Sequence, residues 1–211
     1  MPPAGMSSLI SSPLTLRMSE GDLIPEPWGS FLRELDEMAS EPVDFHCIGG
    51  FVITRKYGFQ RETRDIDVLS IAPNAQLQDF MNKGAEGSEL DRKYRVYLDL
   101  VGVIEAYPED YENRLAEMYP RQLKHIQLLA PEAHDLALMK LGRNIERDRE
   151  DVKYLARQGL ITPEELRRRY ETEMRSYIAQ PEQRTDPVLE LWVEMIREEV
   201  ETKNAAKRLN L

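Results

Sequence analysis

The chain has 211 residues, a formal net charge of −10 at pH 7 and a hydrophobic fraction of 41%, which describe an ordinary soluble protein. The acidic balance argues against a general nucleic-acid binder, which usually carries a basic surface. No apolar run approaches the ~20 residues of a membrane span, and the N-terminus has neither the basic start nor the long apolar stretch of a signal peptide. The single cysteine, Cys47, excludes an intramolecular disulfide. We therefore expect a cytoplasmic protein with no membrane partner.

The predicted elements begin after a segment without periodicity. Residues 1–25 mix Pro, Ser, Gly and Met in no regular order, which predicts a flexible tail. Pro27 is expected to be the first residue of a helix. The apolar stripe of this helix comprises Trp28, Phe31, Leu32, Leu35 and Met38.

The next segment predicts a strand, a short helix and a second strand. The two strands are expected at residues 44–48 and 65–71, with the helix at residues 51–57. Gly49 and Gly50 separate the first strand from the helix, where glycine lets the backbone approach a ligand closely. Backbone amides at a helix start favour phosphate, so we predict a phosphate contact there. A simple turn is the alternative.

Two aspartates, Asp65 and Asp67, lie two positions apart on the second strand. At this spacing both carboxylates project from one face, while Ile66 and Val68 enter the core. Aspartate is disfavoured in strands, and two carboxylates held close repel each other unless a cation lies between them. Magnesium, which prefers oxygen ligands, is the expected ion. An ordinary exposed strand face is the competing interpretation.

The remaining segments complete a sheet and then become helical. We expect a helix at residues 76–82, a turn region or irregular insertion at 84–93, and strands at 94–101 and 125–129. In the third strand, alternation places Asp99 on the polar face. From Pro131 onward the pattern is that of helices.

The C-terminal helices have clear local signals. Thr162-Pro163-Glu164-Glu165 combines a capping box with proline at the first helical position. Residues 181–187 are expected to be a break. The final amphipathic helix has an apolar side formed by Val188, Leu191, Trp192, Met195, Ile196 and Val200.

These elements predict an α+β fold with a small mixed β-sheet flanked by helices and a helical C-terminal part. The sheet-containing core is expected at residues 26–130. Residues 131–211 are expected to form a helical region that completes the cleft.

Two sequence blocks resemble a known superfamily. The apolar-Gly49-Gly50 segment followed by Asp65-Ile66-Asp67 resembles the nucleotidyltransferases related to DNA polymerase β. The form Arg61-x-Thr63-x-Asp65-Ile66-Asp67 is similar to one branch, the AbiEii and MenT-like toxins of bacterial toxin–antitoxin pairs. The second block, Lys140 followed by Arg147-Asp148-Arg149-Glu150-Asp151, is similar to later motifs of that branch. The resemblance covers roughly residues 44–160.

The resemblance implies a set of site residues. Asp65, Asp67 and Asp99 would be the catalytic and metal-binding carboxylates, with Asp99 also able to accept the proton of the attacking hydroxyl. Two Mg²⁺ ions would stabilise the attacking and leaving oxygens. A solvent-facing aspartate at a strand end is the alternative for Asp99.

Further residues are expected to bind the nucleotide. Thr63 and Arg64 lie beside the metal pair, although Arg64 could equally be solvated. Lys140 would neutralise the triphosphate. The alternative is a structural lysine on a buried helix, whose aliphatic stem packs in the core while its ammonium group extends to solvent. Asp148 and Asp151 share one helical face. They would position the lysine or the sugar, or else form surface ion pairs.

The implied activity is Mg-dependent transfer of a nucleoside monophosphate from a nucleoside triphosphate to an acceptor hydroxyl. The toxin branch implies a tRNA 3′ end as acceptor and a cognate antitoxin protein as partner. A second hypothesis keeps the chemistry and takes a small cationic acceptor, as in antibiotic nucleotidyltransferases. A third is an inactive fold that serves as a binding module. The run Arg167-Arg168-Arg169 is a solvated helix face or, alternatively, an RNA contact.

Overall fold

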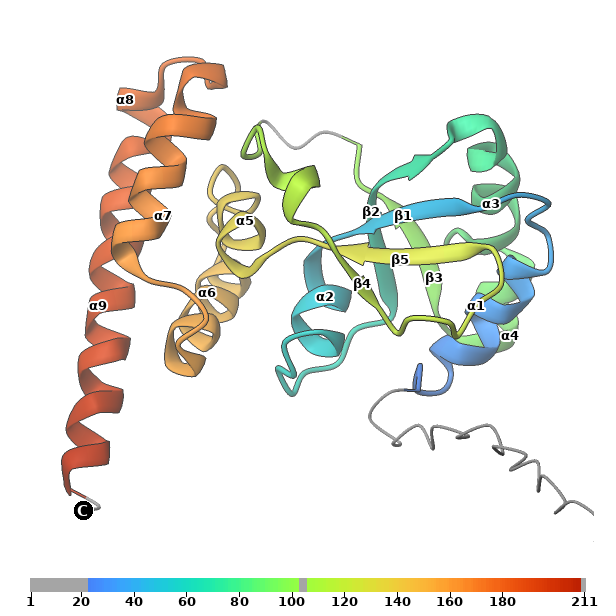
Figure 1. The fold of residues 1–211 in the computed structure, drawn as a ribbon, viewed down its shortest axis with the longest axis horizontal. Coiled ribbons are helices and arrows are strands. Elements are labelled where there is room, and N and C mark those ends of the chain that lie inside the picture. Colours follow the sequence, from blue (N-terminus) through green and yellow to red (C-terminus); the bar gives the residue numbers. More distant parts are fainter. Residues whose placement is uncertain (1–22, 103–105, 210–211) are drawn as a thin grey trace, which may run out of the picture.

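The structure, a computed structural model, describes residues 23–102 and 106–209 and places a mixed β-sheet beside a group of helices (Figure 1). The five strands are β1 (Val43–Cys47), β2 (Asp65–Ala72), β3 (Tyr97–Leu100), β4 (Ala116–Met118) and β5 (Ile126–Ala130). Their order in the sheet is β3-β2-β1-β5-β4. Strands β1/β5 and β2/β3 pair in parallel, whereas β1/β2 and β4/β5 are antiparallel. The predicted α+β class with a mixed sheet is confirmed.

Within residues 23–102, four helices pack against this sheet and against one another. They are α1 (Trp28–Asp36), α2 (Gly49–Arg55), α3 (Leu77–Gly84) and α4 (Glu89–Tyr94). Edge-to-face aromatic pairs join them to the core, with ring centroids 5.5 Å apart for Trp28–Phe51 and 5.1 Å apart for Phe45–Phe80. Asp36, at the end of α1, accepts three backbone N–H groups at 2.7 Å just before and at the start of β5. These contacts fix the end of the first helix to the start of β5.

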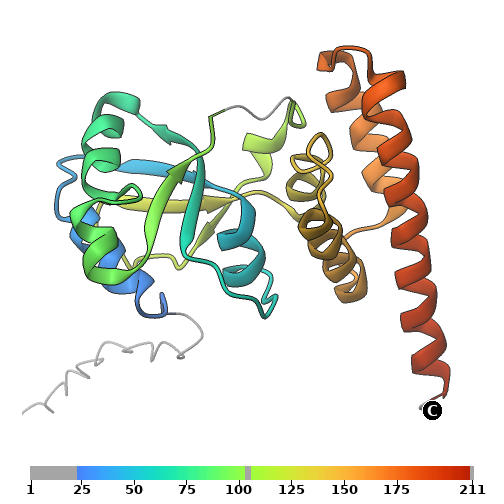
Figure 2. The same cartoon turned by 180° about the vertical axis from the view of Figure 1, so that it is seen from behind.

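The C-terminal half is helical, as predicted, and lies beyond one end of the sheet (Figures 1 and 2). It contains α5 (Ala133–Leu138), α6 (Glu146–Gln158), α7 (Pro163–Arg169), α8 (Pro181–Arg184) and α9 (Asp186–Leu209), with the short π-helix η4 (Tyr170–Met174) and 3-10 helix η5 (Arg175–Tyr177) between α7 and α8. The long helix α9 packs along α6 and α7. Through the described part of the chain, no helix is both long and apolar enough to cross a membrane.

Two local predictions, the cap at Thr162 and the burial of Trp192, are confirmed at the level of atoms, and two further contacts fix the core. The Thr162 hydroxyl accepts the Glu165 N–H at 3.3 Å, so the predicted cap starts α7. Trp192 on α9 is fully buried and donates its indole N–H to the Asn144 side chain at 2.9 Å. Cys47 is a buried thiol, and burial raises its pKa well above the usual value. His134, whose Nε2 accepts the Thr162 N–H at 3.0 Å, links α5 to the start of α7.

The predicted insertion at residues 84–93 and the length of the third strand were wrong. Residues 89–94 form α4, because the Ser88 hydroxyl caps the helix by accepting the Asp91 N–H at 3.2 Å. Arg95 ends this helix in the left-handed region, with φ of 62°, so the strand starts only at Tyr97. Strand β4, three residues long, was not predicted because so short a run carries no clear alternation.

The boundaries of the outer segments also differ from expectation. The predicted break at residues 181–187 contains α8, and α9 already begins at Asp186. Pro27 precedes the first helix as its N-cap instead of opening it. Met38 and Leu191, assigned to apolar faces, are 40% and 54% exposed. Most of the predicted N-terminal tail lies outside the described residues, but Ile24 belongs to the core.

Candidate active site

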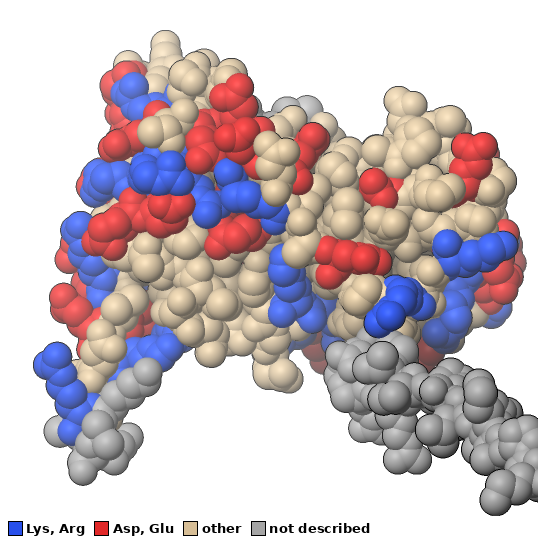
Figure 3. Space-filling model, in the orientation of Figure 1, with Lys and Arg blue, Asp and Glu red and all other residues tan. Residues whose placement is uncertain are grey.

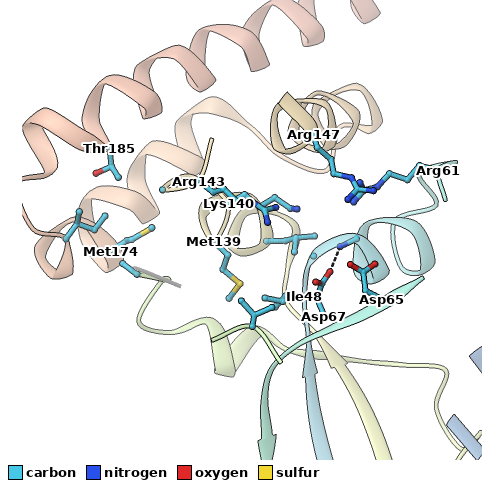
Figure 4. A pocket seen from close by; sticks show the side chains of 17 residues that line it. Ile48, Arg61, Asp65, Asp67, Met139, Lys140, Arg143, Arg147, Met174 and Thr185 are labelled. Carbon is cyan, nitrogen blue, oxygen red and sulfur yellow. Dashed lines mark hydrogen bonds between the residues drawn. The ribbon is translucent and has the colours of Figure 1, made fainter. Parts of the chain in front are cut away.

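A cavity of about 410 Å³ lies where the sheet meets the C-terminal helices (Figure 4). Its size is that of a pocket for one small ligand. One end is polar and the other is apolar. The lining residues are Ile48, Gly49, Gly50, Arg61, Asp65, Asp67, Val101, Ala106, Leu136, Met139, Lys140, Gly142, Arg143, Arg147, Met174, Ile178 and Thr185.

Asp65 and Asp67 reach this cavity from β2. Burial alternates along the strand, with Ile66 and Val68 fully buried and the two aspartates partly exposed, as the spacing predicted. The Thr63 hydroxyl donates to Asp65 Oδ1. Burial and the nearby negative charge of Asp65 raise the pKa of Asp67 to about 6. The two carboxylates therefore hold closely spaced, mutually repelling negative charges at the polar end of the cavity.

The side chains of Asp67 and Arg61 lie so close to Gly49 and Gly50 that little room remains for a Cβ atom at either glycine. Gly49 has φ of +63°, and a Cβ there would lie 1.9 Å from Asp67 Oδ2. A Cβ on Gly50 would lie 3.0 Å from Arg61 Nη2 and 3.0 Å from Thr63 Oγ1. The Gly50 N–H donates to Asp67 Oδ2 at 2.9 Å. In this structure that amide positions a carboxylate, and the predicted phosphate contact of the two glycines stays a prediction.

Asp99 lies beside Asp67 on the neighbouring strand. The two residues are register partners in the parallel β2/β3 pair, so their side chains share a face. Asp99 is exposed and lies outside the cavity lining, although its charge contributes to the raised pKa of Asp67. This arrangement places a third carboxylate next to the pair on the solvent side.

The donor set fits magnesium that arrives with a phosphate ligand. Across residues 23–102 and 106–209, the structure contains no cluster of three or more His, Cys, Asp or Glu side chains arranged to hold a metal. Mg²⁺ commonly keeps several waters and binds through one or two carboxylates plus substrate phosphates. Asp65 and Asp67 supply that number of carboxylates, and their mutual repulsion would be relieved by a cation.

The opposite wall of the cavity is formed by an ion-pair network around two buried aspartates. Lys140, only 6% exposed, places its Nζ 2.9 Å from Asp151 Oδ2 and 3.3 Å from Asp148 Oδ1. Arg143 makes a bidentate contact with Asp148 at 2.6 and 2.8 Å. Arg61, from the loop before β2, contacts Asp151 at 3.2 Å. Asp148 and Asp151 are fully buried on one face of α6, so the alternative of surface ion pairs is wrong.

Sequence reasoning missed several cavity residues. Arg61 and Arg147 were given no specific role in the site, and Arg143 was not considered. The available signal in the sequence was that each of these arginines lies within a few residues of a motif aspartate. The apolar residues Met174 and Ile178 gave none, because they reach the cavity only through the packing of the C-terminal helices.

Two predicted contacts fall outside the cavity. Arg64 donates to the Arg95 carbonyl at 2.9 Å and to Asp91 at 3.1 Å, so the structure directs it away from Asp65. Thr63 lies behind the lining and donates a hydrogen bond to Asp65.

The run Arg167 to Arg169 is paired throughout, with Glu190, Glu165 and Asp135 among its partners. Figure 3 shows positive and negative side chains interleaved over these helices.

Comparison with known proteins gives a family that agrees with the chemistry suggested by the site. A family model described as a nucleotidyltransferase of unknown function (DUF6036) matches residues 30–200. No curated protein matches the chain, and no solved structure does. The matched segment contains the glycine pair, the aspartate pair and the lysine–aspartate network. The chain therefore belongs to this nucleotidyltransferase family, whose function is unknown.

Proposed function

We propose that this protein transfers a nucleoside monophosphate from a nucleoside triphosphate to an acceptor hydroxyl in a magnesium-dependent reaction. The observation that carries the proposal is the polar end of the cavity. There Asp65 and Asp67 project from one strand toward a cationic wall that includes Arg147 and is supported by the ion pairs of Lys140 and Arg143. Carboxylates for a metal and cations for phosphates are the two requirements of nucleotidyl transfer.

Each residue has a defined task in this reaction. The acceptor oxygen forms a bond to the α-phosphorus, the bond from that phosphorus to the leaving oxygen breaks, and pyrophosphate departs. Mg²⁺ held by Asp65 and Asp67 would neutralise the negative charge of the phosphates. Asp99, exposed beside Asp67, would accept the hydroxyl proton. The buried network around Lys140 keeps the cationic wall in position.

Two classes of acceptor are consistent with the sequence, an RNA and a small cationic molecule. The toxin-branch resemblance suggests a tRNA 3′ end, with a cognate antitoxin restraining the activity. The paired state of Arg167, Arg168 and Arg169 and the net charge of −10 favour a small cationic acceptor instead. An inactive binding module is disfavoured, because such a module has no need to keep two carboxylates converging on a cavity.

Label transfer tests the proposal. The purified protein is incubated with Mg²⁺ and each labelled nucleoside triphosphate, with no acceptor, with total bacterial RNA, or with a panel of polyamine and aminosugar acceptors. Transfer should require Mg²⁺ and disappear in Asp65→Asn. Asp79→Asn, an exposed aspartate on α3, is the matched control and should be fully active. Absence of transfer under every condition with folded protein would overturn the proposal.

A further inference from the structure

The positive residues at the cavity are not equivalent. Lys140 is enclosed by two carboxylates at 2.9 and 3.3 Å, and Arg143 is engaged by both oxygens of Asp148. Their charges are already compensated by buried partners. A phosphate that competed for Lys140 would have to weaken a buried ion pair, which leaves a carboxylate uncompensated.

Arg61 and Arg147 differ from those two residues. Arg61 makes a single 3.2 Å contact with Asp151 through Nη2, while its Nε and Nη1 atoms are buried without any hydrogen-bond partner among the described residues. Buried donors that lack a partner are costly. In the described part of the chain no ion pair is formed by Arg147, which lines the same end of the cavity. Figure 4 shows the two side chains reaching toward each other above Asp65.

Two guanidinium groups close together repel each other unless an anion binds between them. The proximity is also seen in the lowered pKa of Arg61, for which burial is the main cause and the charge of Arg147 a further one. Guanidinium groups bind phosphate oxygens through paired N–H donors. The nearby Asp65 and Asp67 disfavour a carboxylate ligand with no metal of its own and favour a phosphate chain that carries Mg²⁺.

We infer that Arg61 and Arg147 form a clamp for the terminal phosphates of a polyphosphate ligand, and that Lys140 is a positioning residue that holds Asp148 and Asp151. This inference rests on the proposed function for the identity of the ligand as a nucleoside triphosphate. It departs from the expectation that Lys140 itself neutralises the triphosphate. The clamp makes the site selective for triphosphates over monophosphates.

Binding measurements without turnover test the clamp. Titration calorimetry is performed with inorganic tripolyphosphate, ATP and AMP, each with and without Mg²⁺, on the full-length protein. Arg147→Gln should weaken tripolyphosphate and ATP binding by about 10- to 100-fold and change AMP binding less than about threefold. Arg157→Gln, an equivalent change on α6 at a residue that pairs with Glu199, should leave all three affinities unchanged.

A second variant guards against a folding defect. Because Arg61 contacts buried Asp151, Arg61→Lys is used in place of a neutral substitution, and it should lose part of the tripolyphosphate affinity with an unchanged melting temperature. Equal losses for AMP and tripolyphosphate, or no loss in Arg147→Gln, would overturn the clamp. Loss of RNA binding with unchanged tripolyphosphate binding would also overturn it, by assigning the arginines to an acceptor.

The clamp and the proposed function can fail separately. Tripolyphosphate binding that depends on Arg147, together with no transfer to any acceptor, would support the clamp and refute the transfer reaction. Transfer that proceeds with unchanged triphosphate affinity in Arg147→Gln would do the reverse.

Discussion

Two pairs of aspartates lie on the two sides of the cavity, and their surroundings are opposite. Asp65 and Asp67 on β2 are partly exposed, and the pKa of Asp67 is raised to about 6 by burial and by the charge of Asp65. Asp148 and Asp151 on α6 are fully buried. Burial alone would raise the pKa of Asp148, but hydrogen bonds from Arg143 and the charge of Lys140 outweigh it, so that pKa is lowered.

We interpret the difference as that between a pair proposed to bind a ligand and a structural pair. A carboxylate whose charge is uncompensated in the folded protein is poised to bind a cation, and the fold gives up stability to keep it so. A carboxylate with cationic partners at 2.6 to 3.3 Å instead supports the wall on which other groups are mounted. Both pairs stand in motifs, yet only the carboxylates of the first pair line the cavity.

The largest expected effect comes from removing a charge of the first pair. Asp65→Asn and Asp67→Asn should each reduce nucleotidyl transfer by about 10³-fold, because each removes a proposed ligand of the Mg²⁺ that would neutralise the reacting phosphate. Initial rates of label incorporation measure this. Far-UV circular dichroism and the melting temperature should show that both variants are folded. An Asn variant with full turnover would remove that residue from the catalytic assignment.

The next effect is on stability and concerns the second pair. Lys140→Met should lower the free energy of unfolding by about 3–5 kcal/mol, because it leaves two buried carboxylates short of a partner. Urea denaturation measures the change. Lys153→Met, at a lysine whose partner Glu150 is exposed, should cost about 0.5 kcal/mol or less. A small cost for Lys140→Met would mean that Arg61 and Arg143 suffice to compensate both aspartates.

A glycine substitution tests how the first pair is held. Gly49→Ala should cost more than about 2 kcal/mol, since it adds left-handed backbone strain to a contact of 1.9 Å with Asp67 Oδ2. Gly87→Ala is the matched control. Gly87 has φ of +77° with nothing within 4 Å of its Cβ position, so only the backbone strain of about 1 kcal/mol applies. Equal losses in the two variants would show that Asp67 moves aside freely.

The first pair was predictable from sequence because its geometry is local. Alternation along one strand places Asp65 and Asp67 on the same face wherever the strand goes. The confirmed cap at Thr162 is local in the same sense.

The surroundings of the second pair were not predictable, because they depend on how distant segments pack. Nothing near Asp151 in sequence announces that Arg61, 90 residues earlier, will contact it. The region of α4 was predicted to be a turn or irregular insertion, because Gly84 and Gly87 are typical of turns. The helix-capping role of Ser88 was therefore not recognised. The methionine and isoleucine of the apolar end required the docking of η4 and η5, which no short pattern encodes.

The smallest expected effect, and the most direct contrast between the pairs, is the pH dependence of stability. Asp67 has a folded-state pKa of about 6, above its usual value of 3.8. Its stabilising contribution is therefore present below about pH 4 and is lost as pH rises through 6. This loss corresponds to at most about 3 kcal/mol, and solvent on the open side should reduce it to about 1–2 kcal/mol.

Asp67→Asn should accordingly stabilise the metal-free protein at pH 7.5 and have almost no effect near pH 4. Asp148, with a lowered pKa, contributes stability above its unfolded value and loses it only on acidification, so Asp148→Asn should destabilise at pH 7.5. Urea midpoints at both pH values measure these opposite signs. Mg²⁺ at ten times its Kd should raise the stability of the wild type by about 1.4 kcal/mol and do little for Asp67→Asn. The same sign in both Asn variants would mean that Asp67 is compensated as fully as Asp148, and the distinction between the two pairs would be lost.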